Sequence, residues 1–194
     1  MTAAAYVPTD AETGSPRPTF PWLALAGGFA LGVALLGGRK VGMQLTTAVA
    51  GDWLRQLKAE HRMAQGLFEL GLRTREHETG KRTAILAHLA YALLKHGVQE
   101  ETVVYPTLRD HGADKAAVNL ADEHFDIKTY LHRLAETPKN DPRWIKLWRE
   151  FYDLVAHHIR EEEDKVFPPM HAALTDRQNR KLTLAMNREG VKLA

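Results

Sequence analysis

Four stretches of this chain, between residues 46 and 174, repeat apolar residues at alternating spacings of three and four. That period turns one side of each stretch into the buried face of a helix. Long helices joined by short turns pack as a bundle with neighbours antiparallel. The sequence therefore predicts an all-α fold, an up-down-up-down four-helix bundle, with helices over residues 47–75, 81–110, 114–136 and 141–167.

Helix ends are marked by residues suited to them. Asp141-Pro142 pairs a good N-cap residue with proline at the first helical position, and Pro168-Pro169 is expected to stop the fourth helix. After the bundle, residues 175–194 are expected to form a short C-terminal helix. It opens with the capping-box pattern Thr175-x-x-Gln178 and is expected to end before Gly190.

Histidine is the unusual component, with ten residues and no cysteine in the chain. Each expected helix carries one histidine on its apolar stripe, and two helices add a glutamate one turn later. All six side chains therefore face the core. They are the predicted metal ligands His61, His96, Glu100, His124, His158 and Glu162.

The pattern occurs twice, at an offset of 62 to 63 residues. Ala59-Glu60-His61 matches Asp122-Glu123-His124. His96-x3-Glu100-Glu101-x3-Tyr105-Pro106 matches His158-x3-Glu162-Glu163-x3-Phe167-Pro168. A helix pair used twice around a pseudo-twofold axis would deliver two histidines and one glutamate from each half. That is the symmetry of a two-metal centre, and divalent cations would offset the cost of burying these groups.

Other polar residues near this pattern have simpler interpretations. Glu101 and Glu163 follow the ligand glutamates and either orient ligands or belong to a solvated face. Tyr105 and Phe167, which precede prolines, are expected to be packing residues at the end of the bundle. The remaining histidines are expected on the surface or behind the ligands: His77, His88, His111, His132, His157 and His171.

On His61, His96-x3-Glu100, His124 and His158-x3-Glu162 the chain resembles the hemerythrin-like (HHE cation-binding) family over residues 47–172. The resemblance implies two non-haem iron ions with an oxo or hydroxo bridge, and Glu100 and Glu162 as bridging carboxylates. Zinc or manganese would also suit imidazole and carboxylate ligands. The ligand set is closest to that of the repair-of-iron-centres proteins, whose cysteine-bearing N-terminal domain is missing here.

Oxygen-carrying hemerythrins have a second histidine four residues after the one on the third helix, where this chain has Lys128. Four histidines, two bridging glutamates and the oxo or hydroxo bridge would give each metal five ligands and leave a sixth position open. Oxygen, nitric oxide or peroxide could bind there. The departure favours a sensor or redox protein over a reversible oxygen carrier. An iron storage or delivery protein is the alternative.

The N-terminal part has a different composition. Residues 1–19 are expected to be a disordered tail. Residues 20–38 contain no charge and are long enough to cross a membrane. A buried or partner-binding helix is the alternative. Gly28 and Gly32 have the spacing of a helix-packing motif, so a scaffold role within a membrane complex is a third hypothesis.

A cleaved signal peptide fits less well, because Ala48-Val49-Ala50 lies ten residues beyond the apolar run. Arg39 and Lys40 follow the run and place the C-terminal domain in the cytoplasm. The formal net charge of +2, without a dense basic stripe, does not favour nucleic acid as a partner.

Overall fold

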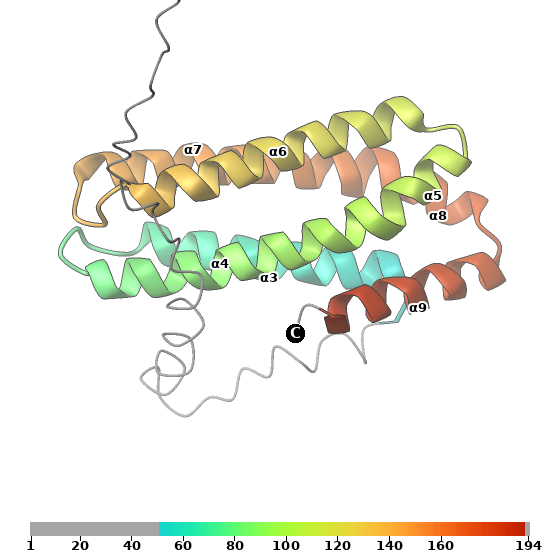
Figure 1. Ribbon diagram of the computed structural model, residues 1–194, viewed down its shortest axis with the longest axis horizontal. Helices are drawn as coiled ribbons and strands as arrows, with labels where there is room; N and C mark the ends of the chain where they lie inside the picture. The colour runs from blue at the N-terminus through green and yellow to red at the C-terminus, as the bar shows by residue number, and fades with distance from the viewer. Residues whose placement is uncertain (1–50, 193–194) are drawn as a thin grey trace, which may run out of the picture. The chain divides into compact units, whose positions relative to one another are not determined.

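The structure, a computed structural model, describes residues 51–192. Four long helices lie side by side with their neighbours antiparallel, and the pairs α3–α4, α4–α6, α6–α7 and α7–α3 are in contact (Figure 1). The described part of the chain is therefore an all-helical bundle, as expected. The four helices are α3 (Trp53–Leu72), α4 (Thr79–Gln99), α6 (Asp114–Glu136) and α7 (Pro142–Arg160).

Side-chain caps mark the starts of α3 and α7. Asp52 accepts a hydrogen bond from the backbone N–H of Arg55 at 3.0 Å, and Gly51 before it has φ of 77°. Asp141 accepts from the N–H of Arg143 at 2.8 Å, which confirms it as the cap of α7. A side-chain oxygen in this position satisfies a backbone donor that has no partner within the helix.

Two π-helical segments interrupt the regular α-helical hydrogen bonding, one after α4 and one after α7. They are η1 (Glu100–Val104), which leads into α5 (Tyr105–Asp110), and η2 (Glu161–Val166), which leads into α8 (Phe167–Ala173). The backbone N–H of Tyr105 bonds to the carbonyl of Glu100, and that of Phe167 bonds to the carbonyl of Glu162. Each bond spans five residues, so the helix is wider by one residue at these points.

The predicted stop at Pro168-Pro169 is wrong, because the helix continues through both prolines to Ala173. Proline cannot donate the usual hydrogen bond and its ring crowds the carbonyl four residues earlier. A wider turn ahead of the proline relieves this conflict and lets the helix go on. Pro106 follows η1 in the same way.

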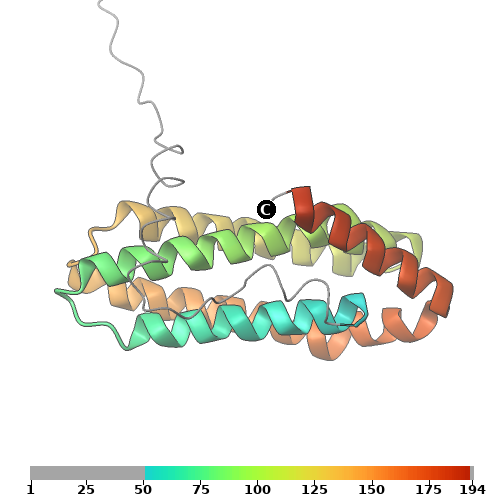
Figure 2. The same ribbon diagram turned by 90° about the horizontal axis from the view of Figure 1, so that it is seen from below.

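Helix α9 (Asp176–Lys192) lies across the end of the bundle that holds α5 and α8 (Figures 1 and 2). Its predicted capping box is confirmed: Thr175 N–H donates to Gln178 Oε1 at 2.9 Å, and Gln178 N–H donates to Thr175 Oγ1 at 3.3 Å. The helix runs past Gly190, where an end was expected. A Cβ there would lie 2.9 Å from Gln99 Nε2, so glycine allows α9 to approach α4 closely.

The buried apolar side chains form two clusters. One fills the half of the bundle around Phe68, Trp148 and Phe151, and the other lies around Trp53, Tyr105 and Phe167, where Leu182 and Met186 of α9 also pack. The six predicted ligands belong to neither cluster. They form a polar layer at the level of His61 on α3, between Leu57 of the second cluster and Ala64 of the first.

Within residues 51–192, no helix combines the length and apolar character needed to cross a membrane. The predicted membrane helix over residues 20–38, and the tail before it, lie outside the described residues.

The contact between α3 and α7 predicts opposite effects for two glycines of α3. A Cβ on Gly71 would lie 2.4 Å from the ring of Trp148, whose Nε1–H is fixed by a 3.0 Å bond to Phe68 O. Gly71→Ala should therefore destabilise the metal-free protein by about 1–3 kcal/mol. Gly66, exposed with nothing within 4 Å of a Cβ, is the matched control. Gly66→Ala should stabilise by about 0.5–1 kcal/mol.

Urea unfolding followed by circular dichroism measures both differences. Equal effects of the two substitutions would contradict this account of the α3–α7 contact.

Candidate metal centre

The structure brings all six predicted ligands together in the bundle. α3 and α6 each supply one histidine, whereas α4 with η1 and α7 with η2 each supply a histidine and a glutamate. None of the six residues is more than 5% exposed. Glu100 and Glu162 are completely buried. Acidic groups in that position need a compensating charge.

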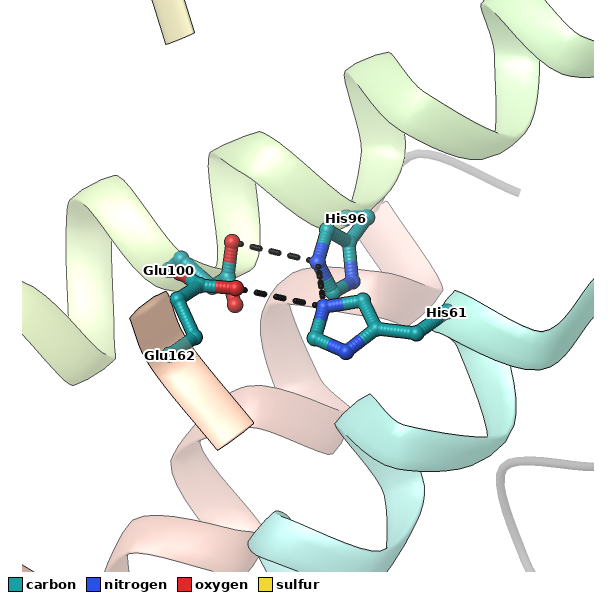
Figure 3. Close-up of side chains that lie close together, drawn as sticks. All are labelled: His61, His96, Glu100 and Glu162. Atoms are coloured by element: carbon teal, nitrogen blue, oxygen red, sulfur yellow. Dashed lines mark hydrogen bonds and ion pairs between the residues drawn. The ribbon is translucent and has the colours of Figure 1, made fainter. Parts of the chain in front are cut away.

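Four of these side chains form a first tetrad: His61, His96, Glu100 and Glu162 (Figure 3). His61 Nε2 lies 2.9 Å from His96 Nε2 and 3.2 Å from Glu162 Oε2. His96 Nε2 lies 3.2 Å from Glu100 Oε2. The nitrogen and oxygen atoms thus point at one common centre.

The second tetrad contains Glu100, His124, His158 and Glu162. His124 Nε2 lies 3.1 Å from His158 Nε2 and 3.3 Å from Glu100 Oε2. His158 Nε2 lies 3.4 Å from Glu162 Oε1. Both tetrads have their ligand atoms within 4.8 Å of one another, and they share both glutamates. The arrangement suits two adjacent cations bridged by two carboxylates.

Each ligand histidine is held from behind by a carboxylate. A carboxylate in this position can accept the Nδ1 proton, so that with a metal bound the Nε2 lone pair would face the centre, as a metal ligand requires. The four Nδ1–carboxylate distances are 2.7 Å for His61–Glu163, 2.9 Å for His96–Glu60, 2.9 Å for His124–Glu101 and 2.6 Å for His158–Glu123.

These four contacts follow the internal repeat. Glu60 and Glu123 hold the histidine of the next helix in their own half, whereas Glu101 and Glu163 hold a histidine of the other half. Glu101 and Glu163 thus contact two of the predicted ligands, as the hypothesis that they orient ligands requires. Sequence reasoning missed the role of Glu60 and Glu123, although both precede a ligand histidine in the repeat and were visible there.

The electrostatics of the metal-free chain show what the site requires. Burial alone would lower the pKa of His96, but the carboxylates of Glu100 and Glu60 outweigh it and raise that pKa well above its ordinary value. Burial would raise the pKa of Glu100, but His96 and His124 hold it well below its usual range. The carboxylates therefore demand positive charge at the centre. Metal cations would supply it in place of protons.

The carboxylate oxygens give a second test of fit. Both oxygens of Glu100 and Oε2 of Glu162 are buried and make no hydrogen bond within the described part of the chain. Buried polar atoms without a partner are rare in folded proteins and need an explanation. Cation binding provides one, because Glu100 Oε2 and Glu162 Oε2 face the same centre as the histidine nitrogens. The residues present fit a two-metal centre.

Tyr105 packs in the second apolar cluster, as expected, but its hydroxyl also reaches the centre, a contact that sequence reasoning missed. Its side chain is fully buried, and its hydroxyl donates to Glu162 Oε1 at 2.8 Å. The hydroxyl oxygen of Tyr105 also lies 3.1 Å from His124 Nε2. Burial and the charges of Glu100 and Glu162 raise its pKa well above the ordinary value, so in the metal-free chain it is a neutral phenol.

A cavity of about 20 Å³ borders the centre on the side of the first apolar cluster. All four ligand histidines line it, together with apolar side chains that include Ala64, Ile127 and Val155. Leu94 of α4 and Lys128 of α6, both exposed, also line it, so it opens toward the surface between these helices. Roughly 10–15 Å³ is enough for a water-sized molecule.

The other histidines stand outside both tetrads, in agreement with the sequence expectation. Three of them make structural contacts, and His111 Nδ1 lies 2.8 Å from the carbonyl of Thr107. His171 Nε2 lies 3.1 Å from Asp52 Oδ2, and His88 Nδ1 lies 2.7 Å from the carbonyl of Ala84.

Comparison with known proteins agrees with this fold and with a cation-binding domain. The model of the hemerythrin HHE cation binding domain matches residues 53–169, more than half of the chain. The chain belongs to this family, and its described part is a hemerythrin-like metal-binding domain.

A crystal structure of a hemerythrin HHE cation binding domain-containing protein from Mycobacterium kansasii, a Rv2633c homolog, has a TM-score of 0.65 and 24% identity. The match covers 73% of this chain and 86% of that chain, and at this identity it shows the fold alone. A DNA nickase from Nostoc sp. is 28% identical over 86 residues. That match covers 44% of this chain, which spans only 24% of the nickase.

The carboxylates behind the histidines predict a measurable effect on metal affinity. Glu163→Gln removes the negative charge at His61 Nδ1 and should weaken metal binding by about 10- to 100-fold. Glu161→Gln is the matched control, because Glu161 lies on the same π-helical segment but pairs with Lys165. It should leave the affinity unchanged.

Zinc affinity, measured by competition with a chromophoric chelator, separates these outcomes. Equal affinities of the two variants would show that Glu163 plays no part in holding His61.

Proposed function

We propose that this protein binds two iron ions, one in each tetrad, with Glu100 and Glu162 as bridging carboxylates. The observation that carries the proposal is the sharing of both glutamates by two complete sets of ligand atoms. Imidazole and carboxylate ligands suit iron, and zinc or manganese are the competing metals. The family to which the chain belongs supports a cation site at these residues.

We further propose that the centre binds or reacts with a small molecule, namely oxygen, nitric oxide or peroxide, as a sensor or redox protein. Iron, when bound, supplies a Lewis acid that changes oxidation state and takes such ligands. The residues of the chain supply the rest. The four carboxylates fix the imidazoles, and the mostly apolar cavity beside His96 and His158 admits a molecule of this size while limiting water.

Iron storage or delivery is the weaker alternative for this centre. A site that must release its metal needs ligands that solvent or a partner can reach. Here the six ligands are at most 5% exposed and are backed by hydrogen-bonded carboxylates. These features favour a retained centre. A mild chelator that removes iron from the folded protein within minutes would favour delivery instead.

The metal part of the proposal is tested by iron analysis of the full chain. We expect two irons per chain in the wild type and in His132→Ala, an exposed histidine of α6 that serves as control. His96→Ala should bind one iron or none. A single zinc ion, with no visible absorption after exposure to air, would contradict the proposal.

The ligand part is tested by the rate at which nitric oxide binds to the reduced, iron-loaded protein. Ala64→Val adds two methyl groups beside the cavity and should slow binding about tenfold, equivalent to ~1.4 kcal/mol of barrier. Ala59→Val, a half-buried position on the same helix outside the cavity lining, has the same cost in helix propensity. Equal rates for the two variants would show that ligands do not pass through this cavity.

We also propose that residues 20–38 anchor the domain to a membrane with the metal centre on the cytoplasmic side. The support is the uncharged sequence and the Arg39-Lys40 pair that follows it. Replacing Leu31 and Leu35 by arginine in the full chain should release it from the membrane fraction. Retention of that variant would favour a partner-bound helix.

A further inference from the structure

Helix α9 has an exposed outer face that is basic. Its inner face packs on the bundle through Leu182 and Met186, both buried in the second apolar cluster. The helix lies on the outside of the bundle, so its other face is open (Figures 1 and 2). All five basic residues of α9 are exposed on this outer face, within an arc of roughly 120° around the helix. They are Arg177, Arg180, Lys181, Arg188 and Lys192.

The charge of α9 differs from that of the rest of the described domain. With two acidic residues, Asp176 and Glu189, the helix has a net charge of +3. Residues 51–175 contain 18 basic and 20 acidic residues, a net charge of −2. Glu189 pairs with Lys192 at 2.7 Å, and three of the five basic side chains have no acidic partner within residues 51–192. Positive charge is therefore concentrated on this face, which favours an anionic partner.

Two apolar side chains stand among these charges. Leu184 is 70% exposed and Val191 is 73% exposed, the largest exposed fractions of any large hydrophobic side chain in the described part of the chain. They are seven residues apart, so they lie on one line along the helix. Apolar side chains flanked by basic ones are typical of a helix that lies in the headgroup region of a membrane.

Helix α9 also holds the residue at which the bundle begins. The N–H of Trp53 donates to Thr183 Oγ1 at 3.0 Å, and its Nε1–H donates to Asn179 Oδ1 at 2.8 Å. Fourteen residues, 39–52, separate Trp53 from the uncharged segment 20–38. That length spans at most about 50 Å when fully extended. An anchor over residues 20–38 would therefore keep α9 within reach of the lipid headgroups.

We propose that the outer face of α9 binds the anionic headgroups of membrane phospholipids, with Leu184 and Val191 inserted between them. About four to eight basic side chains on an amphipathic helix are typical of such binding, and α9 has five. The cytoplasmic leaflet is the anionic one, on the side where we propose that the domain lies. The inference rests on the proposed anchor for the location of α9, whereas the lipid affinity is a property of α9 itself. The family model ends at residue 169, so α9 is an addition to the matched domain.

The test uses the full chain with Leu31 and Leu35 replaced by arginine, so that the proposed anchor does not contribute to binding. Co-sedimentation measures its binding to vesicles of phosphatidylcholine mixed with phosphatidylserine, and to vesicles of phosphatidylcholine alone. We expect binding to the anionic vesicles only. Binding should weaken steeply as the salt concentration rises, because salt screens the charges of an exposed face.

Charge reversal in this chain then identifies the face that binds. Each basic residue near an anionic surface strengthens binding roughly fivefold, so Lys181→Glu with Arg188→Glu should weaken it by at least about 25-fold. Lys146→Glu with Arg149→Glu is the matched control, since both residues are exposed on α7 and the net charge changes equally. It should bind like the parent chain. Should the α9 variant fail to fold, Leu184→Ser keeps every charge and should still weaken binding about tenfold.

Equal weakening by the two charge variants, or no binding to the anionic vesicles, would overturn the inference and leave the proposed anchor standing. Binding to plasmid DNA that depends on Lys181 and Arg188, without binding to vesicles, would overturn it in favour of nucleic acid. The anchor is tested separately on cell membranes washed at high salt, which releases a helix held by charge. The wild type should remain on these membranes, and its loss in the wash would contradict the anchor itself.

Discussion

The structure depends on the placement of two buried carboxylates among four imidazoles in the middle of a helical bundle. Glu100 and Glu162 are shielded from water, and their oxygens meet histidine nitrogens at 3.2 to 3.4 Å. Such a layer is costly in an apolar core unless cations balance it. It also separates the two hydrophobic clusters, so each half of the bundle packs against the site from one side.

The carboxylates behind the imidazoles extend this layer to the surface and connect the halves of the repeat. Glu101 and Glu163 reach across to the other half, and both are also close to a lysine, Lys128 at 2.7 Å and Lys58 at 3.6 Å. The positions of the ligands are therefore fixed by hydrogen bonds as well as by helix packing. A preorganised centre of this kind favours retained metal with chemistry at the centre over release of the metal.

The two halves of the approximate twofold repeat differ in the aromatic residue that follows the π-helical turn, Tyr105 in one and Phe167 in the other. Both turns occur at equivalent places, ahead of a proline, and in both the backbone N–H of an aromatic residue bonds to the carbonyl of the buried glutamate five residues earlier. Only Tyr105 carries a hydroxyl into that position. A single oxygen atom thus distinguishes two tetrads that are otherwise built from the same residue types.

Much of this protein follows from local sequence. The apolar period predicted the four helices, and the expected range of the third helix coincides with α6. The repeated histidines and glutamates pointed to the six residues that the structure gathers in the two tetrads. The helix pattern determines which side chains face inward, and that is a property of neighbouring residues. The contact of Tyr105 with the centre was missed because a 3.6-residue period does not describe a π-helical turn. Glu60 pairs with His96, and Glu123 pairs with His158, across two separate helices in each case. These pairs depend on how the helices approach each other, so only the tertiary structure decided them.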